Sequence, residues 1–146
     1  MIALNVLTLC SLFLFPSTAQ GDNWEQTREL AGTQHEIIML MIDNKQYEQV
    51  PAAAEKIFEL KVPENHQNLF VREAQLLTDA LVLKKEFKVA HQVLDIAVKC
   101  SRTDKIKARI FREKAYLLKK EGNSEEAMRY FEESLELERK TKKSKR

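Results

Sequence analysis

The strongest constraint on the fold of this chain is a helix–turn–helix pattern near its C-terminus. Over residues 104–121, apolar side chains recur at three- and four-residue steps, which places most of them on one side of a helix. Gly122 and Asn123 are expected to end this helix, because glycine readily adopts the left-handed conformation of a helix terminus. Ser124 is expected to cap the next helix. The second helix is predicted to place Ala127, Met128, Phe131, Ser134 and Leu135 on one stripe. A two-residue link between the helices predicts an antiparallel hairpin.

The same layout occurs twice more, upstream of this hairpin. Residues 84–98 repeat it 37 positions earlier, and residues 44–60 repeat it a further 40 positions earlier. The apolar helical segments that precede these stretches cover residues 36–42 and 72–83. No segment shows the alternating pattern of a β-strand. We therefore predict an all-α fold, an antiparallel helix-hairpin solenoid of three hairpins and six helices.

The third hairpin carries residues typical of a known repeat. Phe111 and Ala115 precede its turn, Gly122 lies in the turn, and Ala127 and Phe131 follow it. Together with the period of nearly 40 residues and the helical pairs, these positions resemble the tetratricopeptide repeat, which has small residues where its helices cross. The resemblance implies a superhelix of stacked hairpins.

The other two hairpins depart from the family pattern in places. Thr78 stands in the second hairpin where the family has a small residue, and Ile38 and Val50 occupy both small positions of the first. Spacings of 37 and 40 residues, in place of about 34, imply extra residues in the connections at 62–66 and 101–103. The resemblance covers residues 31–138, with repeats at about 31–61, 71–100 and 108–138.

The first 21 residues differ from the rest because they contain no charged side chain. Residues 2–15 form an apolar run that ends at Pro16, too short to span a bilayer but typical of a signal peptide. Ala19 and Gly21 would allow cleavage before Asp22. We therefore expect an exported protein, periplasmic or secreted. The alternatives are an uncleaved N-terminus that anchors the protein to a membrane, and a buried helix.

Basic charge is concentrated at the other end of the chain. Residues 139–146 hold six basic residues and no acidic ones, whereas the whole chain has a formal charge of +2. The remainder, without those six positive charges, therefore carries −4. Such a tail is expected to be solvated, and contact with an anionic membrane surface is the alternative. Nucleic acid is not expected as a partner, because the acidic body has no basic stripe with aromatic residues.

No constellation in the sequence points to catalysis, a metal or a cofactor. His35, His66 and His91 lie in separate segments, and none has a Cys or a second His at ligand spacing. The chain has only three glycines and no glycine-rich phosphate loop. Cys100 has no evident base partner and is expected to pack on an apolar helix face. We therefore predict a protein that is not an enzyme and that takes no cofactor or metal.

The family resemblance implies that the first helices of the repeats line a groove for a segment of a partner protein. Three of the groove positions are arginines, which would favour an acidic segment because the guanidinium presents a rigid fork of donors. The alternative is that they keep an exposed helix soluble. The predicted partner-binding residues are Arg72, Gln75, Arg109, Arg112, Tyr116 and Lys119. Trp24 and Leu30 are expected to cover the open end of the stack, where a second copy of the chain is another candidate partner.

The function predicted from the sequence is that of a non-catalytic protein–protein interaction module, an exported adaptor or scaffold. The alternative is a small structural or membrane-surface component, held by the N-terminal segment or by the basic tail. Binding through the tail would weaken steeply as salt rises, whereas binding that buries apolar area in a groove would persist.

Overall fold

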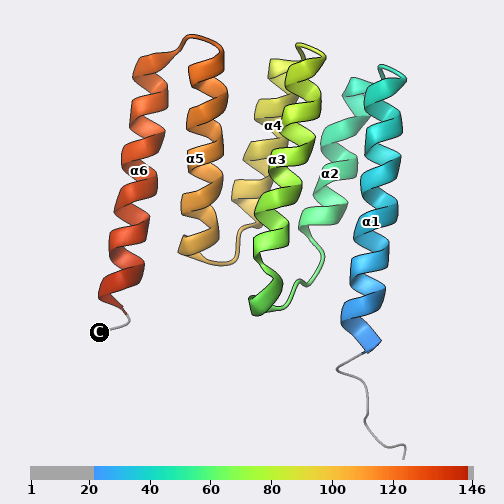
Figure 1. The fold of residues 1–146 in the computed structure, drawn as a ribbon, viewed down its shortest axis with the longest axis horizontal. Helices are drawn as coiled ribbons and strands as arrows, with labels where there is room; N and C mark the ends of the chain where they lie inside the picture. Colours follow the sequence, from blue (N-terminus) through green and yellow to red (C-terminus); the bar gives the residue numbers. More distant parts are fainter. Residues whose placement is uncertain (1–21, 145–146) are drawn as a thin grey trace, which may run out of the picture.

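The computed structural model describes residues 22–144 (Figure 1). Within that range the chain forms six α-helices, two short 3-10 helices and no β-strand, which confirms the all-α prediction for these residues. The α-helices are α1 (Asp22–Asp43), α2 (Val50–Phe58), α3 (Asn68–Leu83), α4 (Phe87–Cys100), α5 (Asp104–Lys120) and α6 (Ser124–Lys143). The 3-10 helices are η1 (Tyr47–Gln49) and η2 (Glu64–His66). The predicted signal peptide, residues 1–21, lies outside the described residues.

The six helices pair into three antiparallel hairpins, α1–α2, α3–α4 and α5–α6, which follow one another in chain order (Figure 1). Helices α1, α3 and α5 run in the same direction, and each contacts the next one in this series. On the other side, α2 packs on α4, and α4 packs on α5. None of the described helices combines the length and the apolar character needed to cross a bilayer. The superhelical solenoid itself stays a prediction.

The three hairpins turn in the same way. Each turn contains one residue with positive φ, Lys45, Lys85 or Gly122, and these residues are 40 and 37 positions apart. The next N–H in each turn donates to the carbonyl five positions earlier, over 2.8 to 2.9 Å, which is the Schellman arrangement of a helix end. The repeat inferred from apolar spacing is therefore also a repeat of backbone conformation. Only the third turn uses glycine, so the left-handed conformation of Lys45 and Lys85 could not be recognised from residue type.

Several local expectations differ from the structure. The side chain that caps α6 is Asn123, which accepts from the Glu126 N–H at 3.3 Å, and not Ser124, because the connection holds three residues instead of two. The first helix begins at Asp22, well ahead of the apolar segment at 36–42. This start was not predicted, because the first turns of the helix are polar and carry no apolar periodicity. Leu30, expected to cover the end of the stack, is exposed.

The extra residues inferred in the connections are present. The chain between α2 and α3 runs over residues 59–67 and includes η2, and Ser101–Thr103 joins α4 to α5. The Thr103 side chain caps α5 by accepting from the Ile106 N–H. Trp24, from the first turns of α1, stacks on His66 of η2 with the ring centroids 4.3 Å apart. The long connection is thereby attached to the first hairpin.

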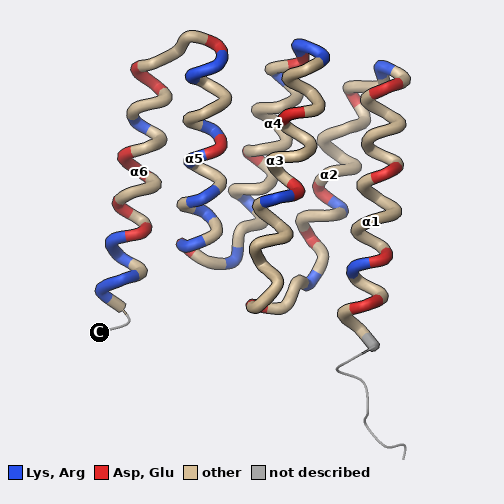
Figure 2. The backbone as a smooth tube through the Cα atoms, in the orientation of Figure 1, with Lys and Arg blue, Asp and Glu red and all other residues tan. Residues whose placement is uncertain are grey.

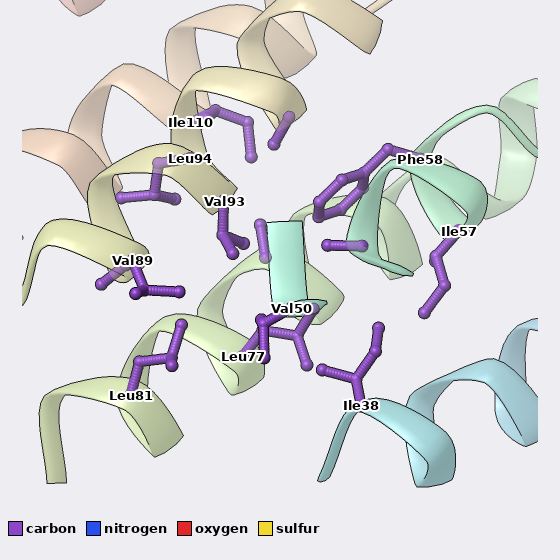
Figure 3. Close-up of a cluster of buried hydrophobic side chains, with 14 of the residues drawn as sticks. Ile38, Val50, Ile57, Phe58, Leu77, Leu81, Val89, Val93, Leu94 and Ile110 are labelled. Carbon is purple, nitrogen blue, oxygen red and sulfur yellow. The ribbon is translucent and has the colours of Figure 1, made fainter. Parts of the chain in front are cut away.

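A single apolar core runs through the hairpins. Ile38, Val50, Leu77, Val93 and Ile110 come from five successive helices and are all fully buried in one cluster (Figure 3). Burying each such side chain contributes about 1.5–3 kcal/mol, so the interfaces between hairpins supply much of the stability. Ala115 and Ala127, predicted at the close crossing of α5 and α6, are both buried.

One buried cation lies between the second and third hairpins. Lys114 of α5 is almost completely buried and donates from Nζ to Oδ1 of Asp95 in α4 at 2.5 Å and to the Tyr130 hydroxyl in α6 at 2.9 Å. Burial by itself would lower the pKa of Lys114, but these two hydrogen bonds outweigh it and raise the pKa above 10.5. The charged amine therefore joins α4, α5 and α6.

Lys85→Gly should stabilise the protein by about 1 kcal/mol, because Lys85 has a left-handed backbone conformation that is costly for an L side chain and not for glycine. Gly122→Ala should destabilise it by about the same amount. Urea unfolding followed by circular dichroism measures both changes. Gln92→Gly, at an exposed position within α4, is the control and should cost about 1 kcal/mol. Equal losses for Lys85→Gly and Gln92→Gly would contradict the left-handed turn.

Two buried hydroxyls should respond in opposite ways to removal. Among the described residues, Thr78 Oγ1 is buried with no hydrogen-bond partner, so Thr78→Val should stabilise the protein by about 1 kcal/mol. Ser134 Oγ donates to the Ala108 carbonyl at 2.7 Å, so Ser134→Ala should cost about 1 kcal/mol. Chemical denaturation of both variants checks this, and a loss of stability in Thr78→Val would show that its hydroxyl has a partner.

Candidate partner-binding surface

The surface formed by α1, α3 and α5 is crossed by polar contacts between neighbouring helices. Between α1 and α3, His35 Nδ1 lies 2.8 Å from Glu73 Oε1, and Lys84 Nζ lies 3.1 Å from Asp43 Oδ1. Between α3 and α5, Gln75 Nε2 donates to Glu113 Oε1 at 2.7 Å. Two further contacts join the same helices, Lys120 to Asp79 at 3.0 Å and Arg109 to Asn68. These contacts pair many of the polar side chains of this surface with a side chain of the neighbouring helix.

All six sequence-predicted binding residues lie on α3 or α5, but five of them are distributed over three separate cavities and Gln75 lines none of these. Tyr116 and Lys119 line one cavity, Arg109 and Arg112 line a second, and Arg72 lines a third. Gln75 is engaged by Glu113, which belongs to the first cavity. The three arginines therefore do not converge on one point.

The first cavity has a volume of about 480 Å³ and mixes both signs of charge. Its lining residues are Asp79, Glu113, Tyr116, Lys119 and Lys120. Tyr116 is held edge-on against Phe131 of α6, with the ring centroids 5.2 Å apart. Burial raises the pKa of Glu113 above 4.5, although the hydrogen bond from Gln75 opposes the change. This cavity presents one fixed aromatic ring beside lysine side chains.

The second cavity is strongly basic. It has a volume of about 270 Å³ and lies between the start of α5 and the end of α6. Its lining residues are Lys105, Arg109, Arg112, Glu138, Thr141 and Lys142. Four cations thus face one carboxylate, and that carboxylate is paired with Arg112. The arrangement is suited to a ligand that carries several negative charges.

The basic tail is part of this second cavity. Helix α6 continues to Lys143, so residues 139–143 extend the third hairpin as helix, and the basic end of α6 lies near the basic start of α5 (Figure 2). Lys142 lines the cavity together with the α5 cations. Thr141 also lines the cavity, and its hydroxyl donates to the Leu137 carbonyl at 2.6 Å. A truncation after Glu138 would remove Thr141 and Lys142, and would therefore alter the cavity as well as the tail.

The third cavity, of about 350 Å³, is mainly apolar and lies between α1, the end of α2 and α3. Its apolar lining includes Trp24, Ile57, Leu60, Leu69 and Phe70. Arg28 and Arg72 are the two arginines that line it. Gly32 also lines this cavity, and a β-carbon added at Gly32 would have no neighbouring atom within 4 Å. The missing side chain therefore leaves this part of the cavity unfilled.

The remaining candidate groups have structural partners. The three histidines contact Glu73, Trp24 and Glu121 respectively, and no group of three potential metal ligands occurs among residues 22–144. Cys100 is a free thiol that packs against the core, as predicted, and burial raises its pKa above 9.0. A thiol with a raised pKa is a poor nucleophile at neutral pH.

Lys105 and Lys142 line the basic cavity but were not predicted from the sequence. The signal for Lys105 was present, because Lys105, Arg109 and Arg112 follow helical spacing and share one side of α5. For Lys142 no local signal exists, since its position depends on how far α6 extends beside the start of α5. The apolar cavity was also missed, because its walls come from three elements far apart in the sequence.

No protein-family model matches the chain, and comparisons with curated proteins and with solved structures give no match either.

The pKa of Glu113 gives a pH-dependent prediction. A carboxyl whose pKa is raised on folding stabilises the protein fully below about pH 4.5, and this contribution is lost as pH rises through the raised pKa. Glu113→Gln should therefore gain stability relative to the wild type as pH increases from 4.5 toward neutrality. Urea unfolding of both proteins at several pH values measures the difference. A difference that does not change with pH would show that Glu113 titrates alike in the folded and unfolded states.

Proposed function

We propose that this protein is a non-catalytic interaction module that binds an acidic segment of a partner protein. The observation that carries the proposal is the basic cavity between α5 and α6, where Lys105, Arg109, Arg112 and Lys142 face a single carboxylate. Charge-assisted hydrogen bonds to carboxylates are stronger than neutral ones, and an arginine can make two in parallel. An acidic segment is therefore the ligand that this cavity would favour.

The basic side chains of the cavity are held in two different ways. Arg109 is bonded to Asn68 of α3 and Arg112 to Glu138 of α6, so both guanidinium groups are positioned before a ligand arrives. Lys105 and Lys142 form no ion pair with another described residue. Positioning in advance lowers the entropy lost on binding, and the lysines add long-range attraction. Partner carboxylates would contact the lysines and the remaining donors of Arg109.

The repeated hairpins support assignment to the tetratricopeptide-like class within the same proposal. Three hairpins with one turn conformation, in chain order, give a rigid frame on which a partner segment can lie. The apolar segment 2–15 supports export as the cellular context. The module would act passively, through its surface alone.

Peptide binding tests the proposal. Fluorescence anisotropy of a labelled glutamate-rich peptide should report binding to the wild-type chain and at least about tenfold weaker binding to Lys105→Glu/Arg109→Glu, since each lost charged contact contributes about 1.4 kcal/mol or more. The matched control is Arg129→Glu, an exposed arginine of α6 that does not line the cavity. It should change the affinity by less than about twofold.

Equal binding of the cavity variant and the wild type, or equal binding of a glutamine-rich peptide, would overturn the proposal. Vesicles that contain an anionic lipid separate it from the alternative of a membrane-surface component. Binding to such vesicles without binding to the glutamate-rich peptide would favour that alternative, with the basic end of α6 as the contact.

A further inference from the structure

Three large apolar side chains of α1 are exposed along one side of the helix. Leu30 is 60% exposed, Ile37 40% and Leu40 60%. Their spacings of seven and three positions place them in a single stripe. Apolar side chains scattered singly over a surface are ordinary, whereas a contiguous stripe indicates a contact surface.

The equivalent positions in the second hairpin are covered. Ile37 lies eight positions before the left-handed residue of its turn, as Leu77 does in the second hairpin, and Leu77 is fully buried. Leu30 corresponds in the same way to Phe70. Phe70 packs on Phe58 of the preceding hairpin, with the ring centroids 4.9 Å apart. The stripe on α1 therefore occupies the positions at which one hairpin packs on the hairpin before it.

The other end of the stack has the complementary property. Leu135 of α6 lies thirteen positions after the left-handed residue of its turn, as Phe58 and Val98 do in the earlier hairpins. Phe58 is fully buried and Val98 packs against the core, but Leu135 is 50% exposed. Met128, one heptad earlier on the same side of α6, is 59% exposed. Leu135 therefore occupies the position at which Phe58 packs on Phe70 of the next hairpin. Met128 corresponds in the same way to His91, which contacts Glu121 of the next hairpin.

The charges at the two ends are also complementary. Helix α1 contains five acidic residues and one basic residue, with Glu25 and Glu29 in its first turns. The last turns of α6 contain Arg139, Lys140, Lys142 and Lys143 (Figure 2). A further helix that runs parallel to α5 would begin near the end of α6, as α5 begins near the end of α4 (Figure 1). The acidic start of such a helix would meet the basic end of α6.

We propose that α1 of one chain packs on the α5–α6 hairpin of a second copy, so that the stack continues from chain to chain. The two surfaces differ, so the contact is head-to-tail, and each added chain leaves one further end open. Every such contact covers the stripe on α1 together with Leu135 and Met128. The preferred partner of each end is the opposite end of the same protein.

Sedimentation of the full chain tests this contact. The wild type, of 17.0 kDa, should show an average mass that rises with concentration. Ile37→Glu/Leu40→Glu (the α1-end variant) and Met128→Glu/Leu135→Glu (the α6-end variant) should each remain monomeric. Circular dichroism should show both variants folded, because the substituted side chains are exposed. Leu83→Glu is the matched control, since Leu83 is 83% exposed on α3, away from both ends, and it should associate like the wild type.

Mixing the two variants gives the decisive result. Each variant retains one intact end, so an equal mixture should form a dimer of twice the chain mass and nothing larger. If two α1 helices contacted each other symmetrically, the α6-end variant would instead associate with itself in the absence of the other variant. This result would overturn the proposal. A wild type that stays monomeric at the highest attainable concentration would overturn it as well, and would indicate that another partner or another segment covers these ends.

Discussion

The packing of each hairpin on the next is the interaction on which the rest of the structure depends. Ile38, Val50, Leu77, Val93 and Ile110 bring five helices into one apolar cluster, and Phe58 and Phe70 continue it toward the long connection. No single hairpin could bury its apolar side alone, because each helix pair has a second face that only a neighbour covers. The same requirement explains the exposed stripes on α1 and α6, where residues 22–144 provide no further neighbour.

The polar surface follows from this packing. Once the apolar sides are fixed, α1, α3 and α5 are brought side by side, and contacts such as Gln75–Glu113 can form between side chains 38 positions apart in the chain. The basic cavity arises because α5 and α6 are antiparallel, which places the start of one helix beside the end of the other. Lys105 and Lys142, distant in sequence, thereby contribute to one electrostatic feature. The proposed binding of an acidic segment depends on this geometry more than on any one arginine.

Much of the fold could be predicted from the sequence, because apolar spacing encodes it directly. The three hairpins, the longer connections, the buried Ala115 and Ala127 and the packed Cys100 were all evident from residue patterns. The left-handed turns at Lys45 and Lys85 were not, since lysine gives no sign of that conformation. The start of α1 was missed because a polar helix has no apolar period. Five of the six predicted binding residues are divided among three cavities. This division depends on side-chain partners such as Asn68 and Glu138, which lie 41 and 26 positions away in the chain.

The most direct test of the central claim, that the hairpins share one continuous core, uses the single tryptophan of the chain. Trp24 stacks on His66 and reports on the first hairpin and its connection, whereas far-ultraviolet circular dichroism reports on all the helices. Urea unfolding followed by both signals should give coincident transitions, and Leu77→Ala, which should cost about 2–5 kcal/mol, should shift both equally. Two separate transitions, or a Trp24 transition that Leu77→Ala leaves in place, would show that the hairpins are independent units and would contradict the account.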